Sequence, residues 1–378
     1  MCGGGEKYVG KIAEVLSVNN DVNFLVEQEP NIDDLENRLG LQLSNIGFSV
    51  AGKSRFISKR NLSLSRLTNG YDLFINQEHF SSIPSKAKRS VSIQEVPPTK
   101  LNVPRYNTFH KILLDTKLKT YDQMVTNSNF TKKWLEEWYG RNAEVLYPPI
   151  ETNRFTPLPK QNFILSVGRF FVADHSKKQF EMIKTFKNLS QNGLRDWELH
   201  LVGSVEDNIQ DREYLEKCRE EAHGYPIHFH VNVSLSKLME LYGCSKIFWC
   251  MTGFGEDANA HPEKMEHFGL STVEAMSAGC VPVVIYRGGQ PEIMRDNIDG
   301  FCWKSIEEFR DRNLRLANNA DLLATMSASS VKRSKHFGMD VFEKKVRKIF
   351  LNPEVPEQCD TVLQSNLNER RKCTNEIA

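Results

Sequence analysis

Two glutamates flank a glycine in the segment EHFGLSTVEAM, which runs from Glu266 to Met276. A helix that begins near Ser271 would present unpaired N–H groups and a positive dipole end beside Gly269, a combination that suits a phosphate. Glu274, one turn into the helix, can accept hydrogen bonds from ribose hydroxyls, and Glu266 can reach a sugar. The same letters also fit a capping box, in which Ser271 and Glu274 serve only the helix start.

Glycines follow several apolar segments of the second half of the chain, at Gly168, Gly203, Gly253, Gly288 and Gly289. The carboxyl ends of parallel strands meet at one edge of a sheet, where glycine lets the backbone approach a ligand closely. The repetition favours a lined crevice at this edge. Separate turn requirements are the alternative.

The elements that must position these residues alternate between short β-rich runs and helical patterns, which predicts the α/β class with parallel sheets. In the second half, strands are expected at 162–169, 197–204, 227–234, 246–253 and 281–286. Helices are expected near 179–189, 211–222, 235–242 and 271–278. The first half shows the same alternation, with strands at 21–28, 71–77, 89–94, 121–128 and 144–149 and helices at 31–41 and 130–140.

A proline-rich segment at 147–161 interrupts the alternation and is interpreted as an interdomain linker. We therefore expect a first domain at 1–152, a second at 153–336, a one-sided amphipathic helix at 337–351 that packs back on a domain, and a loosely ordered tail at 352–378.

Composition excludes several classes of protein. With 40% hydrophobic and 26% charged residues and a formal charge of +1, the chain gives no global argument for a nucleic-acid or membrane partner. No apolar run approaches the roughly 20 residues that span a bilayer. The eight cysteines lack CxxC spacing and favour reduced thiols, so a cytoplasmic location is expected.

In combination, these motifs resemble the retaining GT-B glycosyltransferases of family four, glycosyl transferases group 1. The resemblance rests on Glu266-x7-Glu274 with AMSAGCVPVV and GGQPEI, on SVGRFFVADHSKKQ, on LVGS, on TNSNFT with YPP, and on GGGEK. It implies a GT-B fold, with two Rossmann-like domains facing each other across a cleft. It also implies transfer of a sugar from a UDP- or GDP-linked donor to a glycan or lipid-linked acceptor.

By this resemblance, Arg169 and Lys177 neutralise the donor diphosphate, with adjacent Lys178 as an alternative to Lys177. A leaving diphosphate needs such cations where no metal supplies the charge. A surface ion pair is the alternative for Arg169, and a solvated helix start is the alternative for the two lysines. Glu274 would bind ribose, Glu266 would hold sugar hydroxyls or steady charge in the transition state, and Gly288 and Gly289 would line the sugar side. The remaining donor-binding candidates are Gly168 and the segment Phe268, Gly269, Leu270, Ser271 and Thr272.

The resemblance implies retention at the anomeric carbon, with the departing phosphate assisting deprotonation of the acceptor and no protein nucleophile. No cofactor is expected. No DxD motif is present, and no metal site is predicted, although His261 and His267 lie close in sequence to Glu263 and Glu266.

The first domain departs from the family at two places. The chain begins at GGGEK, without the strand that precedes this loop in the family, so Gly4 and Gly5 are weak acceptor-side candidates and neighbouring strands should be left with unpaired ladder groups. Where family members commonly carry a histidine at a strand end, this chain has Gln94 and Glu95. His79 is the substitute catalytic candidate, and His110 is a weaker one. Ser128 and Asn129 match a family helix start, which an ordinary N-cap also explains.

A stretch without acidic residues carries Lys53, Arg55, Lys59 and Arg60. It is either a solvated loop or a peripheral contact with anionic lipid on the inner face of a membrane. Nucleic acid is a poor partner because aromatic residues are sparse there. Two other functions stay open for the whole chain: a non-catalytic nucleotide-sugar-binding subunit, and a GT-B enzyme of different chemistry such as an epimerase.

Overall fold

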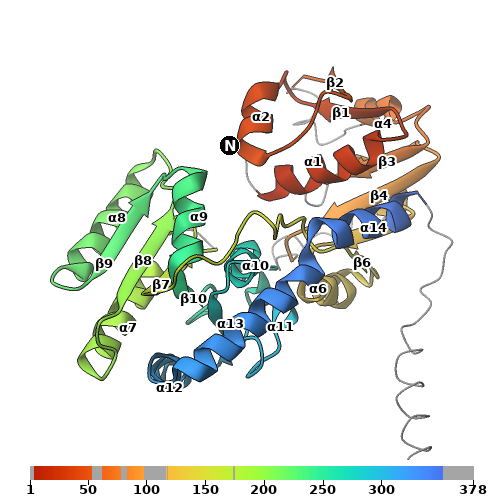
Figure 1. The fold of residues 1–378 in the computed structure, drawn as a ribbon. Helices are drawn as coiled ribbons and strands as arrows, with labels where there is room; N and C mark the ends of the chain where they lie inside the picture. The colour runs from red at the N-terminus through yellow and green to blue at the C-terminus, as the bar shows by residue number, and fades with distance from the viewer. Residues whose placement is uncertain are drawn as a thin grey trace, which may run out of the picture.

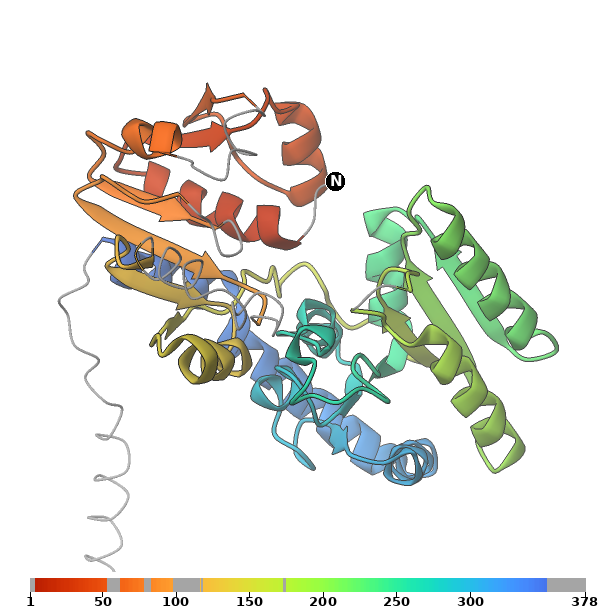
Figure 2. The same cartoon turned by 180° about the vertical axis from the view of Figure 1, so that it is seen from behind.

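The computed structural model describes residues 4–52, 62–77, 83–97, 116, 118–172 and 175–351. Two α/β parts are connected by an extended segment, and a long helical stretch near the C-terminus runs from the second part back to the first (Figure 1 and, from behind, Figure 2). The predicted α/β class with parallel sheets is confirmed, because every strand pair in the described residues is parallel.

The second part is built on a six-stranded sheet in the order β12-β11-β10-β7-β8-β9. Its strands are β7 (Gln161–Val167), β8 (Glu198–Gly203), β9 (Ile227–Val231), β10 (Ser245–Cys250), β11 (Val281–Ile285) and β12 (Phe301–Trp303). The first strand in sequence, β7, lies at the centre, so the direction of winding reverses between β7 and β10. Ligands of such sheets bind beyond the carboxyl ends of the strands at this switch point.

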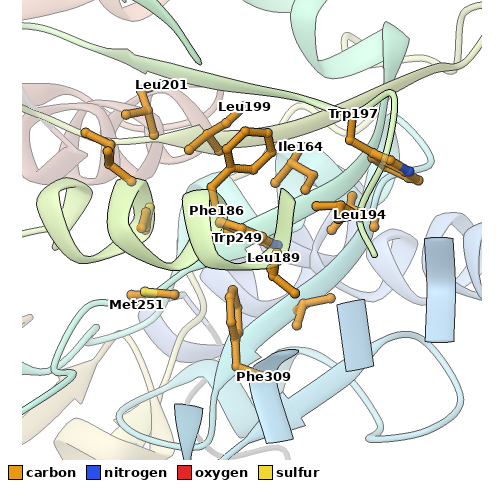
Figure 3. Close-up of a cluster of buried hydrophobic side chains, with 14 of the residues drawn as sticks. Ile164, Phe186, Leu189, Leu194, Trp197, Leu199, Leu201, Trp249, Met251 and Phe309 are labelled. Atoms are coloured by element: carbon orange, nitrogen blue, oxygen red, sulfur yellow. The ribbon is translucent and has the colours of Figure 1, made fainter. Parts of the chain in front are cut away.

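Helices cover both faces of this sheet, which is why its inner strands β7, β10 and β11 are largely apolar runs instead of alternating patterns. They are α7 (Gln179–Gln191), α8 (Ile209–Ala222), α9 (Leu235–Cys244), α10 (Leu270–Ser277), α11 (Gln290–Ile293), α12 (Ile306–Ala317) and α13 (Ala320–Ser334). Figure 3 shows one core layer, where Phe186 and Leu189 of α7 meet Leu199 of β8, Trp249 of β10 and Phe309 of α12. These core contacts hold α7 against the sheet. They thereby also set the position of Lys177 and Lys178, which directly precede the helix.

The first part contains two separate sheets, β1-β2 and β3-β4-β5-β6. Its elements are α1 (Gly4–Ser17), β1 (Val22–Val26), α2 (Ile32–Leu39), β2 (Ile46–Val50), α4 (Leu62–Leu67), β3 (Leu73–Asn76), β4 (Arg89–Gln94), β5 (Gln123–Thr126), α6 (Asn129–Tyr139) and β6 (Glu144–Val145). Leu25 of β1 and Phe74 of β3 pack against the same buried cluster, yet no ladder joins these strands in the described residues.

The break between β1 and β3 corresponds to the place that β7 fills in the second part, between the second strand β8 and the fourth strand β10. Among the described residues, the edges of β1 and β3 that face this break are not paired in a ladder, and these are the edges that the sequence led us to expect. One expectation is corrected here, because Gly4 and Gly5 do not form a loop: they are the first two residues of α1.

The chain returns to the first part through α14 (Met339–Phe350), whose apolar stripe packs on α1. Phe342 lies against Tyr8, with ring centroids 6.1 Å apart. Arg89 of β4 donates hydrogen bonds to the carbonyls of Ile349 and Phe350 at 2.6 and 2.8 Å, which caps the end of α14. The described cysteines, all in the second part, are free thiols.

A single carboxylate connects the two parts at the start of α6. Glu292 of α11 accepts hydrogen bonds from the backbone amides of Asn129 and Phe130 at 2.8 and 2.7 Å and from the Tyr147 hydroxyl at 3.2 Å. Ser128 caps the same helix from its own side, accepting from the Thr131 amide at 3.1 Å. The first turn of α6 therefore has partners from both parts.

We expect Glu292→Ala to lower the free energy of unfolding by about 1.5–3 kcal/mol, because it removes charge-assisted hydrogen bonds and leaves two helix amides unpaired. Urea unfolding followed by far-UV circular dichroism measures the change. Glu213→Ala, on the exposed face of α8, is the matched control and should change stability by less than about 0.5 kcal/mol. Equal losses in the two variants would contradict this role for Glu292.

Candidate functional site

The switch point of the second sheet holds a buried ion pair. Lys177, just before α7, lies over Gly168 at the end of β7, and its Nζ is 2.7 Å from Glu266 Oε2. The Thr252 hydroxyl, just beyond β10, donates to the same carboxylate oxygen at 3.3 Å. The two charged side chains are only 19% and 12% exposed. The structure thus brings together three segments at the edge where the sequence predicted a ligand.

The carboxylate of Glu266 stays ionised despite its burial. Burial alone would raise its pKa, but the positive charge of Lys177, the neighbouring His175 and the hydrogen bond from Lys177 lower the pKa to about 2. Because each charge compensates the other, the pair can stay largely buried from water next to the strand ends. It presents a fixed anion and a fixed cation side by side.

Two histidines that the donor-site prediction did not include lie beside this pair. His175 stacks on His267 with ring centroids 4.8 Å apart, and its Nε2 is 3.8 Å from Glu266 Oε1. Burial, and then the charge of Lys177, lowers the His175 pKa to about 3, so this ring is neutral near pH 7. His175 belongs to the sequence motif HSKKQ, but the prediction of the donor site named only the two lysines of that motif.

His261 and His267 each contact Glu263. His267 Nε2 lies 3.0 Å from the Glu263 carbonyl, and His261 Nδ1 lies 3.0 Å from the Glu263 carboxylate. Within the described ranges, no group of three or more metal-ligating side chains occurs at this edge.

The other predicted cations pair away from Glu266. Arg169 lies 3.0 Å from Glu206 and is 48% exposed, which is the surface ion pair considered from the sequence. Lys178 lies 2.7 Å from Glu256. Its backbone has φ +62° at the N-cap of α7, a left-handed conformation that is costly for a side chain other than glycine. Its donor role and that of Arg169 stay predictions.

Glycines at this edge allow backbone segments to touch each other. A Cβ on Gly203 would lie 2.1 Å from the Gly168 carbonyl oxygen, and one on Gly288 would lie 2.1 Å from the Glu266 carbonyl oxygen. Gly289 donates its amide to that same carbonyl at 2.7 Å. Gly288 and Gly289 therefore hold Glu266 in place through its backbone, and contact of these glycines with a sugar stays a prediction.

Helix α10 begins one residue earlier than expected, at Leu270, with Gly269 as the N-cap in a left-handed conformation at φ +115°. The capping-box alternative is wrong, because Ser271 lies inside the helix and the Tyr242 hydroxyl donates to Glu274 Oε2 at 2.9 Å. Gly269 has no side chain to cap the first turn. The Thr272 amide donates to the Gly269 carbonyl at 3.0 Å, so the amides of Leu270 and Ser271 are the ones left to other partners.

The side chains of Phe268, Thr272 and Glu274, around the start of α10, are largely inaccessible to solvent. Phe268 is 2% exposed and stacks on Tyr147 at 5.2 Å, so its side chain belongs to the core and only its backbone can face a ligand. Thr272 is fully buried, and its hydroxyl has no hydrogen-bond partner. Burial raises the Glu274 pKa, while the Tyr242 hydrogen bond and Lys7 of the first part act against it.

The first part approaches this place through the start of α1. A Cβ on Gly4 would lie 3.3 Å from Leu270 Cδ1, which puts the predicted acceptor-side glycines next to the donor-side helix. The Gly5 carbonyl accepts a hydrogen bond from Gln77 Nε2 at 2.6 Å. Gly4 thus lies beside the start of α10, and the role of Gly4 and Gly5 toward an acceptor stays a prediction.

Gln77 also donates to Glu95 at the end of β4. Burial raises the Glu95 pKa to about 7, although the hydrogen bond from Gln77 lowers it. This is the strand end where a histidine was expected from the resemblance. The other candidates for that histidine, His79 and His110, lie outside the described residues, as do Lys53, Arg55, Lys59 and Arg60.

One cavity of about 550 Å³ is lined by residues 121–124, Lys132 and 140–144. It lies where β5 begins, at the opposite end of the strand from the predicted acceptor side, and it contains none of the predicted site residues. The Lys177–Glu266 pair therefore marks the candidate site better than this cavity does.

Residues 150–333 match the family model described as glycosyl transferases group 1. The chain is 25% identical over 229 residues to a GDP-Man:Man(3)GlcNAc(2)-PP-Dol alpha-1,2-mannosyltransferase of Dictyostelium discoideum, covering 54% of this chain and 42% of that protein. It is 23% identical over 249 residues to the alpha-1,3/1,6-mannosyltransferase ALG2 of Mus musculus, covering 58% and 56%. The chain thus spans about half the length of these relatives.

Solved structures match almost the whole chain. A glycosyltransferase from Rickettsia africae ESF-5 aligns with a TM-score of 0.67 at 15% identity, covering 92% of this chain and 95% of that one. The sucrose-phosphate synthase of Thermosynechococcus elongatus aligns with a TM-score of 0.68 at 15% identity, covering 92% and 93%. Both likenesses concern the fold, and the predicted GT-B architecture is confirmed. Residues 150–333 thus resemble the glycosyl transferases group 1, in a chain that has the GT-B fold.

Proposed function

We propose that this protein transfers a mannosyl group from GDP-mannose to a lipid-linked glycan. The observation that supports it most strongly is the Lys177–Glu266 pair at the switch point of a group 1 domain. The names of two relatives specify mannosyl transfer, and one of them specifies a GDP-Man donor and a PP-Dol-linked acceptor. The narrower claims of retention and of independence from metal are part of this proposal.

In this mechanism the donor diphosphate lies between Lys177 and the first-turn amides of α10. Phosphate oxygens compete with Glu266 for the lysine ammonium, and the freed carboxylate accepts hydrogen bonds from the mannose hydroxyls. As the bond from the anomeric carbon to the phosphate oxygen breaks, the lysine and the helix dipole stabilise the negative charge on the leaving group. The acceptor oxygen then bonds to the same face of that carbon, and its proton passes to the departing phosphate.

A lipid-linked acceptor also gives the basic stretch Lys53, Arg55, Lys59 and Arg60 a role, as a contact with anionic headgroups. Among the described residues, no helix has both the length and the apolar character needed to cross a bilayer.

A non-catalytic subunit that only binds the nucleotide sugar is the second candidate, and the break between β1 and β3 favours it. The two functions differ in turnover. Purified protein is incubated with GDP-mannose and a dolichyl-diphosphate-linked oligosaccharide, and mass spectrometry of the lipid product is expected to show one added hexose. Donor binding without any product or free mannose would favour the subunit.

Donor preference gives a first prediction for this function. GDP-mannose should raise the melting temperature of the full chain more than UDP-glucose does at the same concentration, because binding to the native state alone stabilises it by about 2.7 kcal/mol at a hundredfold excess over Kd. Differential scanning fluorimetry measures this. A larger shift with UDP-glucose would contradict the GDP-linked donor.

The ion pair gives a second prediction. Lys177→Met should lower kcat by about 10²–10³ because it removes the cation that faces the leaving phosphate. It should also cost about 3–5 kcal/mol of stability, since Glu266 is left buried without its partner. In the double variant Lys177→Met/Glu266→Gln, stability should recover while transfer stays lost.

Lys178→Met is the matched control, because Lys178 is the neighbouring lysine and pairs with the less buried Glu256. It should keep most of the activity. If Lys178→Met lost transfer while Lys177→Met kept full activity, Lys178 and not Lys177 would be the lysine that faces the leaving phosphate. Full activity of the stable double variant would remove the pair from the mechanism.

Glu95 on the acceptor side gives a prediction of pH dependence. Its pKa of about 7 in the folded protein lies above the ordinary glutamate value of 4.5, so the folded state holds the proton more tightly. The resulting stability is fully present below about pH 4.5 and is lost as pH rises through 7. Relative to Glu95→Gln, the wild type should therefore lose up to about 3 kcal/mol between pH 4.5 and pH 8.

Urea unfolding of the two proteins at several pH values measures the difference. Glu213→Gln, which changes an exposed carboxyl on α8, should follow the wild-type profile. Parallel profiles for wild type and Glu95→Gln would show that the Glu95 carboxyl titrates normally.

A further inference from the structure

Four polar side chains form a patch on one face of the outer sheet edge, away from the Lys177–Glu266 pair. Glu198 and His200 lie on β8, and His228 and His230 lie on the edge strand β9. In the parallel register His200 is the direct partner of His228. Residues two apart on a strand point to the same face, so all four side chains share one face.

Three of these side chains converge on one point. Glu198 Oε2 lies 3.0 Å from His228 Nε2 and 3.3 Å from His200 Nε2, and the three atoms all lie within 4.8 Å of one another. Ligands of a tetrahedral zinc ion at about 2.0–2.1 Å are separated from each other by roughly 3.3–3.4 Å. Two of the three separations are therefore close to those of zinc ligands before any ion is present.

His200 provides the second, independent observation. Its side chain is only 7% exposed, and its Nε2 is buried without a hydrogen-bond partner. A buried polar atom without a partner costs free energy, and a bound ion would remove that cost. The other ring nitrogen, Nδ1, lies 2.9 Å from His230 Nε2. With the Nδ1 proton donated to His230, the lone pair of His200 Nε2 is directed at Glu198 and His228, as in many zinc-bound histidines.

The charge state of the cluster also suits a metal. A histidine binds a metal ion through the lone pair of its neutral ring. Lys237 of α9 is the nearby cation that would oppose a metal ion, and it is itself paired with Glu240 at 2.8 Å. The Glu198 carboxylate supplies the negative charge of the ligand set.

We propose that Glu198, His200 and His228 bind one Zn²⁺ ion, with His230 orienting His200 and water in the fourth position. Imidazole and carboxylate are ligands that Zn²⁺ accepts, and three protein ligands leave one coordination position open. The ion would cross-link the edge strand β9 to β8. This site lies on the sheet face and not at the strand ends, so it is separate from the proposed sugar transfer and does not depend on it.

The test uses the full chain without a polyhistidine tag, after dialysis against a chelator. Isothermal titration with Zn²⁺ should show one site, and Co²⁺ in its place should give the visible absorption of a tetrahedral complex. His228→Gln should weaken Zn²⁺ binding at least tenfold and abolish that absorption; His228 is about half exposed, so folding should survive. His230→Gln should weaken binding about tenfold, because it removes only the orienting partner.

His223→Gln is the matched control, since it removes an exposed imidazole from the nearby end of α8 and should leave Zn²⁺ binding unchanged. Two results would overturn the proposal: no stoichiometric Zn²⁺ binding by the wild type, or equal affinity in the wild type and His228→Gln.

Discussion

The buried contact between Lys177 and Glu266 is the interaction on which the rest of the site depends. Neither charge could be held at the strand ends alone, because an unpaired buried ion costs several kcal/mol. Together they are stable, and they connect the start of α7, the end of β7 and the loop before α10. The apolar layers on both faces of the sheet keep these segments from separating. The pair is thus a product of the fold.

The same contact requires glycine at positions that carry no charge themselves. Gly288 and Gly289 press against the backbone of Glu266 and His267, and Gly168 lies under the Lys177 side chain. A methyl group at any of them would collide with atoms of the site within 2.5 Å. Close packing of backbone, more than ligand contact, explains why small residues gather at this edge. The sequence analysis considered separate turn requirements as the alternative to a lined crevice. The structure shows which atoms lie against these glycines, namely those of Glu266, His267 and Lys177.

The sequence predicted most of this architecture because its signals are local. Apolar runs and helix patterns place β7 to β11 and α7 to α10 within a few residues. It missed β12, whose three residues give no periodic signal, and β2, which is short and half exposed. It also missed the helices α12 and α13. Pairings between distant residues could not be predicted, since they depend on loop paths. Thus the contacts of Arg169 with Glu206, of Tyr242 with Glu274 and of Glu292 with α6 have no counterpart in any motif.

The two parts of the chain use the same winding but differ at their centres. In the second part β7 pairs on both sides, which makes its carboxyl end rigid and allows it to support Lys177. In the first part no described strand lies between β1 and β3, and the two sheets are held instead by shared clusters around α1, α4 and α14. Side-chain packing constrains strand ends less than a continuous ladder does. Gly5, Gln77 and Glu95 therefore depend on their own hydrogen bonds for position. Because burial raises the pKa of Glu95 to about 7, the carboxylate that accepts from Gln77 titrates near neutral pH.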